Sequence, residues 1–424
     1  MEKKYDLVIG GGGLSGIAAA LAAKRNGVKD VLLIERYGFF GGMATAGLVN
    51  PFMPFWKTGK TRNKNNQLVF GIFQEILDRL TEFNAAKQES NWIFDPEIMK
   101  IVLNKMIKES GIDILLHSYI EGVKKINKKI TSVRVANKSG VYSINSNLFV
   151  DATGDADIAY MAGVPCEKGR KKDGFCQPMT MNFRVANVDK SKMPTSEQIN
   201  RKYEAAKAAG KINNPREDVL KFNTLKDDVI HFNTTRIVKK DATDAVDLTE
   251  AETRVREQIW EMYQFLKNEI PGFKNSYIQQ TATEIGVRES RRIVGKYVLT
   301  KKDVVSGKKF SDSIAYCSYN IDIHNPAGTG TEFAYLDKGD YYGIPYRSLL
   351  PKDVNNLLVV GRPISSTHAA HASLRIMPTC TAIGEAAGVA MALSYKNNII
   401  PEKVNGKKLK EILENKNILP EGDE

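Results

Sequence analysis

A short strand, a glycine-rich turn and a small-residue helix open the chain, and this combination constrains its fold most. Residues 5–9 form an apolar run of buried-strand length, and Gly11, Gly13 and Gly16 follow in the spacing G-x-G-x-x-G before an alanine-rich stretch. The first glycine permits a tight turn, the second lets backbone N–H groups approach a diphosphate, and the third packs helix on strand. This order of strand, glycine-rich turn and helix predicts a Rossmann-like βαβ unit in an α/β fold.

The start of this helix and the end of the next strand are the expected contacts of a dinucleotide. The helix N-terminus at Leu14 and Ser15 is expected to hold the diphosphate, because its unpaired N–H groups and dipole favour anions. A second strand, residues 31–34, ends at Glu35. This carboxylate lies about twenty residues beyond the glycines, where a ribose hydroxyl needs an acceptor. The motif predicts dinucleotide binding without choosing between NAD and FAD.

The residues after Glu35 carry a resemblance to a known family. They continue the pattern with Arg36, Gly41, Gly42, Met43 and Thr45. In this pattern the chain resembles the FAD-dependent oxidoreductases related in fold to glutathione reductase. In that family an arginine, a spacer and a Gly-Gly pair follow the ribose carboxylate, and the glycines let the backbone run under the flavin's linker. The resemblance implies FAD as the cofactor, bound by these residues among others.

A second glycine-containing motif lies near the middle of the chain. An apolar strand, residues 148–150, leads into the sequence Asp-Ala-Thr-Gly-Asp, whose small residues allow close passage beside a cofactor. The resembling family carries the same five residues, whereas the pattern alone also allows a plain strand and turn. The resemblance assigns cofactor contacts to Ala152, Thr153, Gly154 and Asp155. It also implies a backbone contact with adenine near Val123.

A third group of flavin-related residues lies near the C-terminus. A buried strand ends at Gly361 and Arg362, and a small-residue helix begins near Thr379. A helix N-terminus aimed at a flavin would stabilise negative charge on the reduced ring. The resemblance adds Gly361, Arg362, Thr381 and Gly384 to the cofactor-binding residues. The family usually has Gln where this chain has Glu385, so a polar contact from that side chain stays open.

The distribution of these motifs predicts a discontinuous FAD-binding domain with an inserted cap. The FAD-binding domain is expected to combine residues 1–60, 95–165 and 340–400. An α+β cap or substrate domain is expected from residues 61–94 and 166–339, where the periodicity turns mixed, and residues 401–424 form a C-terminal tail. Within these parts, Asp95-Pro96-Glu97 predicts a helix start, with Asp as N-cap and Pro in the first position.

Two residues near the C-terminus are candidates for catalysis. His371 and Arg375 lie between the strand that ends at Arg362 and the helix near Thr379, so we expect them beside the flavin ring. A histidine can move the proton that accompanies a hydride, and an arginine can hold an anion. The family has a histidine and an arginine at these positions, which favours His371 over His368. Hydrogen-bonded scaffold histidines are the alternative, and no metal is predicted because no third ligand follows at a typical spacing.

An arginine-rich segment, residues 284–295, supplies a third catalytic candidate, Arg291. If the segment is helical, its arginines share a face that could hold a carboxylate or an anionic intermediate. These arginines are Arg288, Arg291 and Arg292. An ion-pair cluster with Glu284 and Glu289 is equally compatible with the sequence. The resembling family carries a similar Arg-Glu-x-Arg-Arg.

Composition excludes several classes of protein. The four cysteines are scattered without a C-x-x-C pair, and no second glycine fingerprint for NADPH is present, so a disulfide reductase is not expected. Cysteine usage indicates a reducing cytoplasm, and the absence of 18 consecutive apolar residues argues against membrane attachment. The net charge of +12 comes from dispersed lysines without aromatic interleaving, so a nucleic-acid partner is not favoured.

The sequence therefore predicts a soluble FAD-dependent oxidoreductase that transfers a hydride between a small-molecule metabolite and flavin. Two alternatives stay open. One is a flavoenzyme acting on tRNA, which would use the basic surface. The other is a non-catalytic flavin-bound subunit that passes electrons to a partner.

Overall fold

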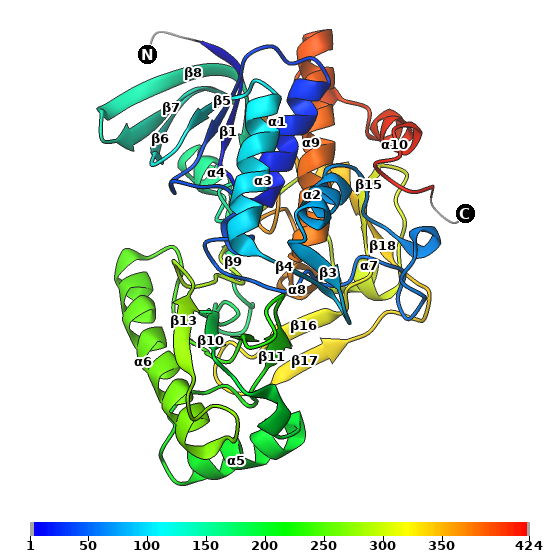
Figure 1. Ribbon diagram of the computed structural model, residues 1–424. Coiled ribbons are helices and arrows are strands. Elements are labelled where there is room, and N and C mark those ends of the chain that lie inside the picture. The colour runs from blue at the N-terminus through cyan, green and yellow to red at the C-terminus, as the bar shows by residue number, and fades with distance from the viewer. Residues whose placement is uncertain (1–3, 422–424) are drawn as a thin grey trace.

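A parallel sheet forms the centre of the larger of two bodies (Figure 1). The computed structural model describes residues 4–421. The sheet order is β5-β2-β1-β8, and β19 pairs with the free edge of β8's C-terminal half. These strands are β1 (Tyr5–Gly10), β2 (Val31–Ile34), β5 (Asp113–Leu115), β8 (Gly140–Asp151) and β19 (Leu357–Val359). Strands β1, β2 and β19 are almost wholly buried, as expected for parallel strands covered on both faces.

The predicted strand–turn–helix unit is confirmed at the centre of this sheet. Leu7 of β1 is paired in parallel with Val31 of β2 and with Leu148 of β8. Strand β8 is long enough to pair also with an antiparallel hairpin, β6 (Tyr119–Ile126) and β7 (Lys129–Asn137). The carboxyl ends of β1, β2 and β8 therefore meet at one edge, where the glycine-rich turns follow.

Helices α1 (Leu14–Arg25) and α9 (Met377–Asn397) pack side by side on the sheet, shown in blue and orange in Figure 1. Glycines permit this close approach, because a Cβ at Gly384 would lie 2.0 Å from the carbonyl oxygen of Ser15. A Cβ at Gly388 would lie 2.4 Å from that of Ala19. Helix α3 (Pro96–Glu109) begins at the predicted N-cap, with the Asp95 carboxylate accepting from two first-turn N–H groups.

Helix α2 (Gly71–Glu82) packs against α9 and α3, in the core of the larger body. Its apolar face of Ile72, Ile76 and Leu80 is buried there. The sequence grouped residues 61–94 with the inserted cap, and this boundary stays a prediction; in the structure the amphipathic face of α2 has its apolar partners beside the sheet.

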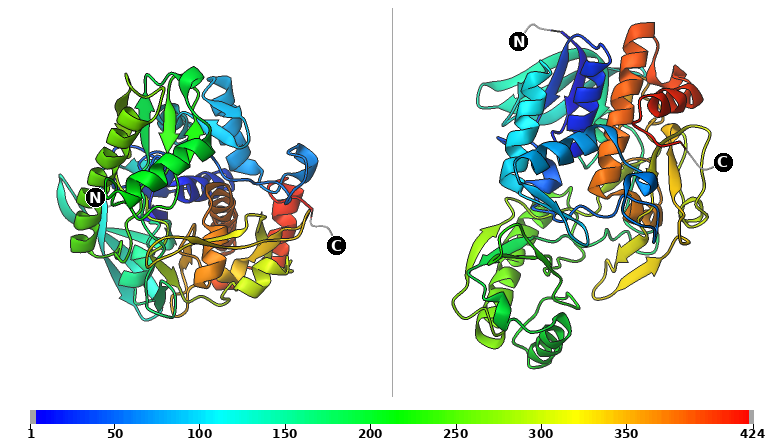
Figure 2. Two further views of the ribbon diagram at one scale, coloured as in Figure 1. Left: turned by 90° about the horizontal axis from the view of Figure 1, so that it is seen from below. Right: turned by 45° about the vertical axis from the view of Figure 1, so that its right-hand side comes forward.

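The smaller body, at the bottom of Figure 1, is built from residues between 179 and 285 around a core of its own. An antiparallel sheet in the order β11-β12-β10-β13 packs against two helices, and Figure 2 shows them from two further sides. The strands are β10 (Phe183–Ala186), β11 (Lys221–Asn223), β12 (Ile230–Phe232) and β13 (Tyr277–Thr281), and the helices are α5 (Ser196–Ala208) and α6 (Ala245–Glu269).

Short elements connect the two bodies and cover the larger one. The strands are β3 (Ala86–Gln88), β4 (Trp92–Phe94), β9 (Cys166–Lys168), β14 (Arg291–Ile293), β15 (Ser313–Cys317), β16 (Ile321–His324), β17 (Thr331–Ala334) and β18 (Tyr342–Pro345). The helices are α4 (Asp157–Met161), α7 (Lys301–Val305), α8 (His368–Leu374) and α10 (Gly406–Asn415). Short 3-10 helices cover Gly42–Ala44, Lys64–Asn66, Lys190–Lys192, Tyr346–Ser348 and Pro401–Lys403.

The arginine-rich segment, residues 284–295, is not helical. It runs as extended and turn structure into the short strand β14, which pairs with β9. The arginines therefore do not share a helix face, and the condition on which the arginine fork depended is not met. Although the spacing of the arginines is compatible with a helix, the segment pairs with β9 as a strand.

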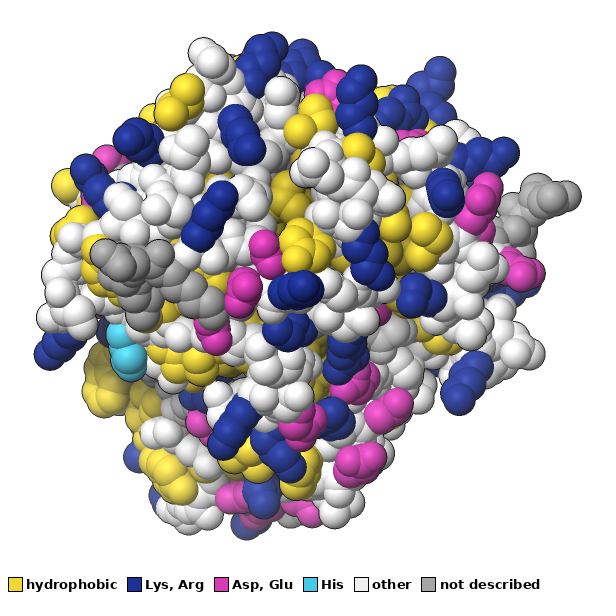
Figure 3. Space-filling view, turned by 90° about the horizontal axis from the view of Figure 1, so that it is seen from above, with side chains coloured by type: hydrophobic (Ala, Val, Ile, Leu, Met, Phe, Trp, Pro, Cys, Tyr) yellow, Lys and Arg dark blue, Asp and Glu magenta, His cyan; other side chains and the backbone are white. Residues whose placement is uncertain are grey.

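Within residues 4–421 no single helix is long and apolar enough to cross a membrane; α8 and α9 meet these criteria only as a pair bent by 93°. On the face shown in Figure 3, Lys and Arg side chains are scattered among acidic and neutral ones.

Candidate active site

A cavity lies at the carboxyl ends of β1, β2 and β8, the edge where open α/β sheets bind ligands. Most of the cofactor-binding residues predicted from the sequence line it. They are Gly11, Gly13, Leu14, Ser15, Glu35, Arg36, Gly41, Gly42, Met43, Ala152, Thr153, Gly154, Gly361 and Arg362. Residues from four distant parts of the chain therefore converge on one cavity, which we call the first cavity.

Two helix N-termini face the first cavity. Helix α1 begins after Gly13 and α9 after Ile376, and neither helix has a side-chain N-cap hydrogen bond. Leu14 and Ser15 of α1, and Met377 and Cys380 of α9, line the cavity. Uncapped N–H groups and the positive ends of two helix dipoles are thus available to an anionic ligand.

The glycines of the first turn differ in the space that surrounds them. Gly11 has a φ of 101°, and a Cβ there would lie 2.3 Å from the carbonyl oxygen of Ala152. A Cβ at Gly16 would lie 1.9 Å from the carbonyl oxygen of Gly11. Gly13 differs, because its nearest neighbour would be the Cα of Gly42 at 3.9 Å. Protein packing does not require a glycine at residue 13, which leaves this position of the cavity open.

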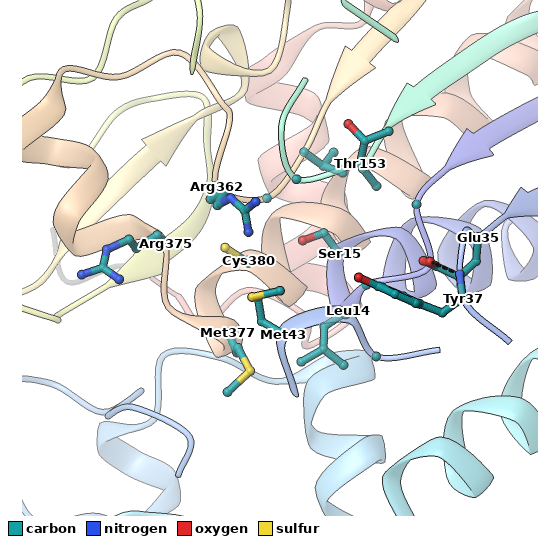
Figure 4. A pocket seen from close by; sticks show the side chains of 18 of the residues that line it. Leu14, Ser15, Glu35, Tyr37, Met43, Thr153, Arg362, Arg375, Met377 and Cys380 are labelled. Carbon is teal, nitrogen blue, oxygen red and sulfur yellow. Dashed lines mark hydrogen bonds between the residues drawn. The ribbon is translucent and has the colours of Figure 1, made fainter. Parts of the chain in front are cut away.

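Glu35 lies at one end of the first cavity, beside Tyr37 (Figure 4). Its carboxylate accepts hydrogen bonds from the backbone N–H of Gly12 at 2.6 Å and of Tyr37 at 2.9 Å. Burial raises its pKa to about 7. Arg36 forms an ion pair at 2.6 Å with Glu284, which connects this end of the cavity to the arginine-rich segment.

A second and larger cavity, of about 540 Å³, adjoins the first. The two cavities share the lining residues Met43, Arg362, Arg375 and Met377. Figure 4 shows Arg375 at the end opposite Glu35, with its guanidinium turned away from the residues of the first cavity. Arg375 therefore lies at the junction of the two cavities.

Polar groups of the second cavity form a network on strand β16. The Asp322 carboxylate accepts a hydrogen bond from the Tyr319 hydroxyl at 3.1 Å and lies 3.5 Å from Nε2 of His324. Nδ1 of His324 lies 3.0 Å from a guanidinium nitrogen of Arg236, which can only donate. Burial and the charge of Arg288 lower the pKa of His324 to about 3, so this histidine is neutral.

The candidate catalytic residues take three different places. Arg375 lines both cavities, whereas His371 and Arg291 line neither. His371 is buried in α8, neither ring nitrogen has a hydrogen-bond partner among the described residues, and burial with the charges of Arg292 and Arg375 holds its pKa well below the ordinary value. Arg291 forms an ion pair with Asp157 at 2.8 Å.

The remaining predicted cofactor residues support the first cavity from outside it. Gly16 and Gly384 allow close packing of backbone, as described above. Thr45 donates to the carbonyl oxygen of Phe40 at 2.8 Å, Asp155 pairs with Arg362 at 2.7 Å, and Thr381 donates to the carbonyl oxygen of Met377 at 2.8 Å. Val123 does not line the cavity; Ser118, Tyr119 and Ile120 line a small recess beside Glu35 and Arg36 instead.

Several lining residues have no signal in the sequence. These are Tyr37, Met377 and Cys380 of the first cavity, and Arg216, Tyr319, Asp322 and His324 of the second. Glu284 of the first cavity and Arg288 of the second were named in the sequence only as members of the arginine-rich segment. Those of the second cavity come from separate turns and strands without a shared motif. Only the tertiary fold brings them together.

Comparison with known proteins identifies the family. The model of the FAD dependent oxidoreductase family matches residues 6–413. The chain belongs to this family. Its cofactor is FAD, and the chain is an oxidoreductase. No curated protein matches the chain.

Several solved structures are similar to this chain. The p-nitrophenol 4-monooxygenase of Pseudomonas putida is 10% identical with a TM-score of 0.50, over 97% of this chain and 84% of that one. A geranylgeranyl bacteriochlorophyll reductase-like protein of Thermoplasma acidophilum is 12% identical with a TM-score of 0.48, over 98% and 84%. The L-proline dehydrogenase of P. horikoshii is 12% identical with a TM-score of 0.43, over 99% and 100%.

The first cavity fits FAD. The two uncapped helix N-termini suit a diphosphate and a ring that becomes negative on reduction, and the open position at Gly13 leaves room for the diphosphate. The buried carboxylate beyond the second strand suits a ribose.

Proposed function

We propose that this oxidoreductase transfers a hydride between a small metabolite in the second cavity and FAD in the first. The observation that supports this most is the junction of the two cavities, which share Met43, Arg362, Arg375 and Met377. A cavity of about 540 Å³ has the usual size of a small-molecule site. When bound, FAD supplies a ring that accepts or returns a hydride.

The FAD-binding roles follow from the groups that line the first cavity. The diphosphate would lie on the N-terminus of α1, over Gly13, and the N-terminus of α9 would face the flavin. Glu35 would accept hydrogen bonds from the adenosine ribose. Arg36, held by Glu284, would close the adenine end.

FAD affinity should depend on pH through Glu35. The ionised carboxylate accepts hydrogen bonds from the ribose hydroxyls more strongly than the protonated acid does, and burial raises the pKa of Glu35 in the protein to about 7. Affinity should therefore rise with pH up to about 7 and then level off, with a loss of roughly tenfold between pH 8 and pH 6. FAD titrations monitored by flavin fluorescence measure this dependence. Glu35→Gln should bind more weakly with a flat profile; an unchanged slope in that variant would remove Glu35 from the ribose site.

A proton must move with the hydride. When a metabolite is oxidised at a carbon bearing O–H or N–H, the hydride leaves the carbon, the C–O or C–N bond becomes double, and the O–H or N–H proton needs an acceptor. We assign this step to Tyr319 and Asp322, because both line the second cavity and are hydrogen-bonded to each other. The phenol would take the substrate proton as it gives its own along the hydrogen bond to Asp322. Against the effect of burial, His324, Arg375 and Arg288 hold the pKa of that carboxyl well below its ordinary value, so the proton would pass on to solvent rather than stay there. His371 lines neither cavity and its ring nitrogens have no hydrogen-bond partner among the described residues, so we assign it no step.

Anaerobic reduction of the bound flavin tests the proposed function. The FAD-loaded protein, mixed with members of a metabolite library in the absence of any other protein, should lose its oxidised flavin absorption with at least one compound. Asp322→Asn should slow that bleaching while FAD content stays unchanged. Bleaching only after a partner protein is added would instead support an electron-transfer subunit, and bleaching only with tRNA present would support the RNA-modifying alternative.

A further inference from the structure

The second cavity contains two arginines that lack a carboxylate partner. The other arginines in or beside it are paired: Arg216 with Asp218 at 2.7 Å, Arg236 with Glu217 at 2.9 Å, and Arg362 with Asp155 at 2.7 Å. Within residues 4–421, no Asp or Glu oxygen lies within 4.0 Å of the guanidinium nitrogens of Arg288 or Arg375. The fold does not neutralise these two charges by direct contact.

Arg288 and Arg375 are held by neutral groups only. Arg288 donates to the carbonyl oxygen of Pro178 at 2.7 Å, to the hydroxyl of Thr180, and to the side-chain oxygen of Asn233 at 3.3 Å. For Arg375, a single nitrogen, Nη2, makes the two hydrogen bonds that the described residues provide, both at 3.4 Å, and its buried Nε has no partner. These contacts orient the guanidinium groups and leave hydrogen-bonding capacity on Arg375 for a ligand.

The negative charge nearest these arginines is already engaged. Asp322 accepts from Tyr319 and lies against His324, and Arg375 contacts its backbone carbonyl rather than its carboxylate. Burial and the neighbouring positive charges of Arg375 and Arg216 lower the pKa of Arg288 well below its ordinary value. Two guanidinium groups therefore face one carboxylate and a neutral histidine. A partly buried site with such an excess of positive charge is costly unless a ligand supplies an anion.

One part of the second cavity is apolar, beside polar lining residues such as Asn50, Asn91, Asn182 and Thr331. Leu220, Phe222 and Phe333 line it from β11, β17 and the adjoining chain, and Met53 and Val287 add to this surface. Such side chains accommodate an aliphatic or aromatic group and offer nothing to a second anion.

We propose that Arg288 and Arg375 bind the carboxylate of a small organic acid whose remaining part is apolar. This inference rests on the proposed function, because it assigns the substrate class of the same cavity. Two guanidinium groups can donate in parallel to the two oxygens of one carboxylate, which gives orientation as well as affinity. The bound acid would be held at the junction with the first cavity, because Arg375 lines both.

Binding of 3-phenylpropanoate to the oxidised, FAD-loaded protein tests this inference. Calorimetry or the perturbation of the flavin spectrum gives the dissociation constant of this acid. Two control ligands are measured in the same way: acetate, which lacks the apolar group, and 3-phenylpropanamide, which has the same shape without the charge. The acid should bind at least about thirtyfold more tightly than the amide, because the amide leaves a buried charge unpaired. It should also bind more tightly than acetate.

Three variants assign the effect to residues. Arg288→Gln and Arg375→Gln should each weaken binding of the acid by roughly thirtyfold or more and leave binding of the amide unchanged. Asp322→Asn should strengthen binding of the acid, since it removes a competing negative charge. This gain cannot arise from misfolding. Arg201→Gln, on the exposed face of α5 and paired with Glu197, is the matched control and should leave both affinities unchanged.

The outcomes separate this inference from the proposed function. Binding to the oxidised protein needs no electron transfer, so the acid can bind even if no metabolite bleaches the flavin. Equal affinities for acid and amide, no binding of the acid, or an unaltered affinity in Arg288→Gln would overturn the carboxylate site. If Arg375→Gln changes the reduction potential of the flavin but not the affinity for the acid, Arg375 serves the flavin and the two-arginine site is wrong.

Discussion

Gly13→Val should abolish stable FAD binding while leaving the fold intact. Residue 13 has a φ of −68° and a ψ of 174°, a conformation open to any residue. Apart from its neighbours in the chain, only the Cα of Gly42, at 3.9 Å, lies within 4 Å of the place that a Cβ would take. The added side chain would project into the first cavity, where the diphosphate is expected. We expect a loss of FAD affinity well above about tenfold, and a colourless purified protein.

Two measurements check this expectation. The absorption of the purified protein at flavin wavelengths reports FAD binding, and the melting temperature of the apoprotein reports whether the fold is intact. Gly328→Val is a suitable control, since a Cβ there meets nothing within 4 Å and residue 328 lines neither cavity. Full flavin occupancy in Gly13→Val would show that the diphosphate lies elsewhere. Loss of flavin together with the fold would assign residue 13 to packing.

Arg292→Met should destabilise the protein by about 3–5 kcal/mol, because it leaves a buried carboxylate without its cation. Arg292 and Glu289 form an ion pair in which the side chains are 2% and 0% exposed. Arg292 also donates to the carbonyl oxygens of Ser366 and Gly169, both at 3.0 Å, so it joins the chain before and after the arginine-rich segment. Urea unfolding followed by circular dichroism gives the change in the free energy of unfolding.

The double variant Arg292→Met/Glu289→Leu should recover part of this loss, since both charges are then removed. Arg201→Met is the control: its pair with Glu197 is 74% exposed on both sides, and it should change stability by less than about 1 kcal/mol. A double variant that is less stable than Arg292→Met would mean that the hydrogen bonds of Glu289 to Gln177 and His368 matter more than its charge.

The parts of the molecule that could be predicted from the sequence are those governed by local geometry. The turn from Gly11 to Gly16 has one glycine that needs a positive φ and another that cannot carry a Cβ, so the spacing of glycines reports the structure directly. The helix start at Asp95 is a local hydrogen-bonding motif of the same kind. The fold class followed from such motifs, the family and FAD followed from the resemblance that the residues carry, and all three are confirmed.

The second cavity could not be predicted, because no local pattern encodes it. Arg288 and Arg292 are four residues apart and would share a helix face, yet in the structure one lines the cavity and the other is buried in an ion pair. Pairing of β14 with β9 sets that difference. The domain boundaries and the residue roles of the site stay predictions; among the catalytic candidates, the structure favours Arg375 over His371 and Arg291 because it alone lines a cavity.

The most direct test of direct hydride exchange is an anaerobic single-turnover measurement with a metabolite that bleaches the flavin, deuterated at the carbon that loses hydrogen. The FAD-loaded protein and the metabolite are mixed alone, and the decay of the oxidised flavin absorption is followed at saturating substrate. The account predicts that deuteration slows this decay several-fold, because the C–H bond breaks in the step that reduces the flavin. Decay that is equally fast with both isotopologues, and that needs a second protein to begin, would contradict it.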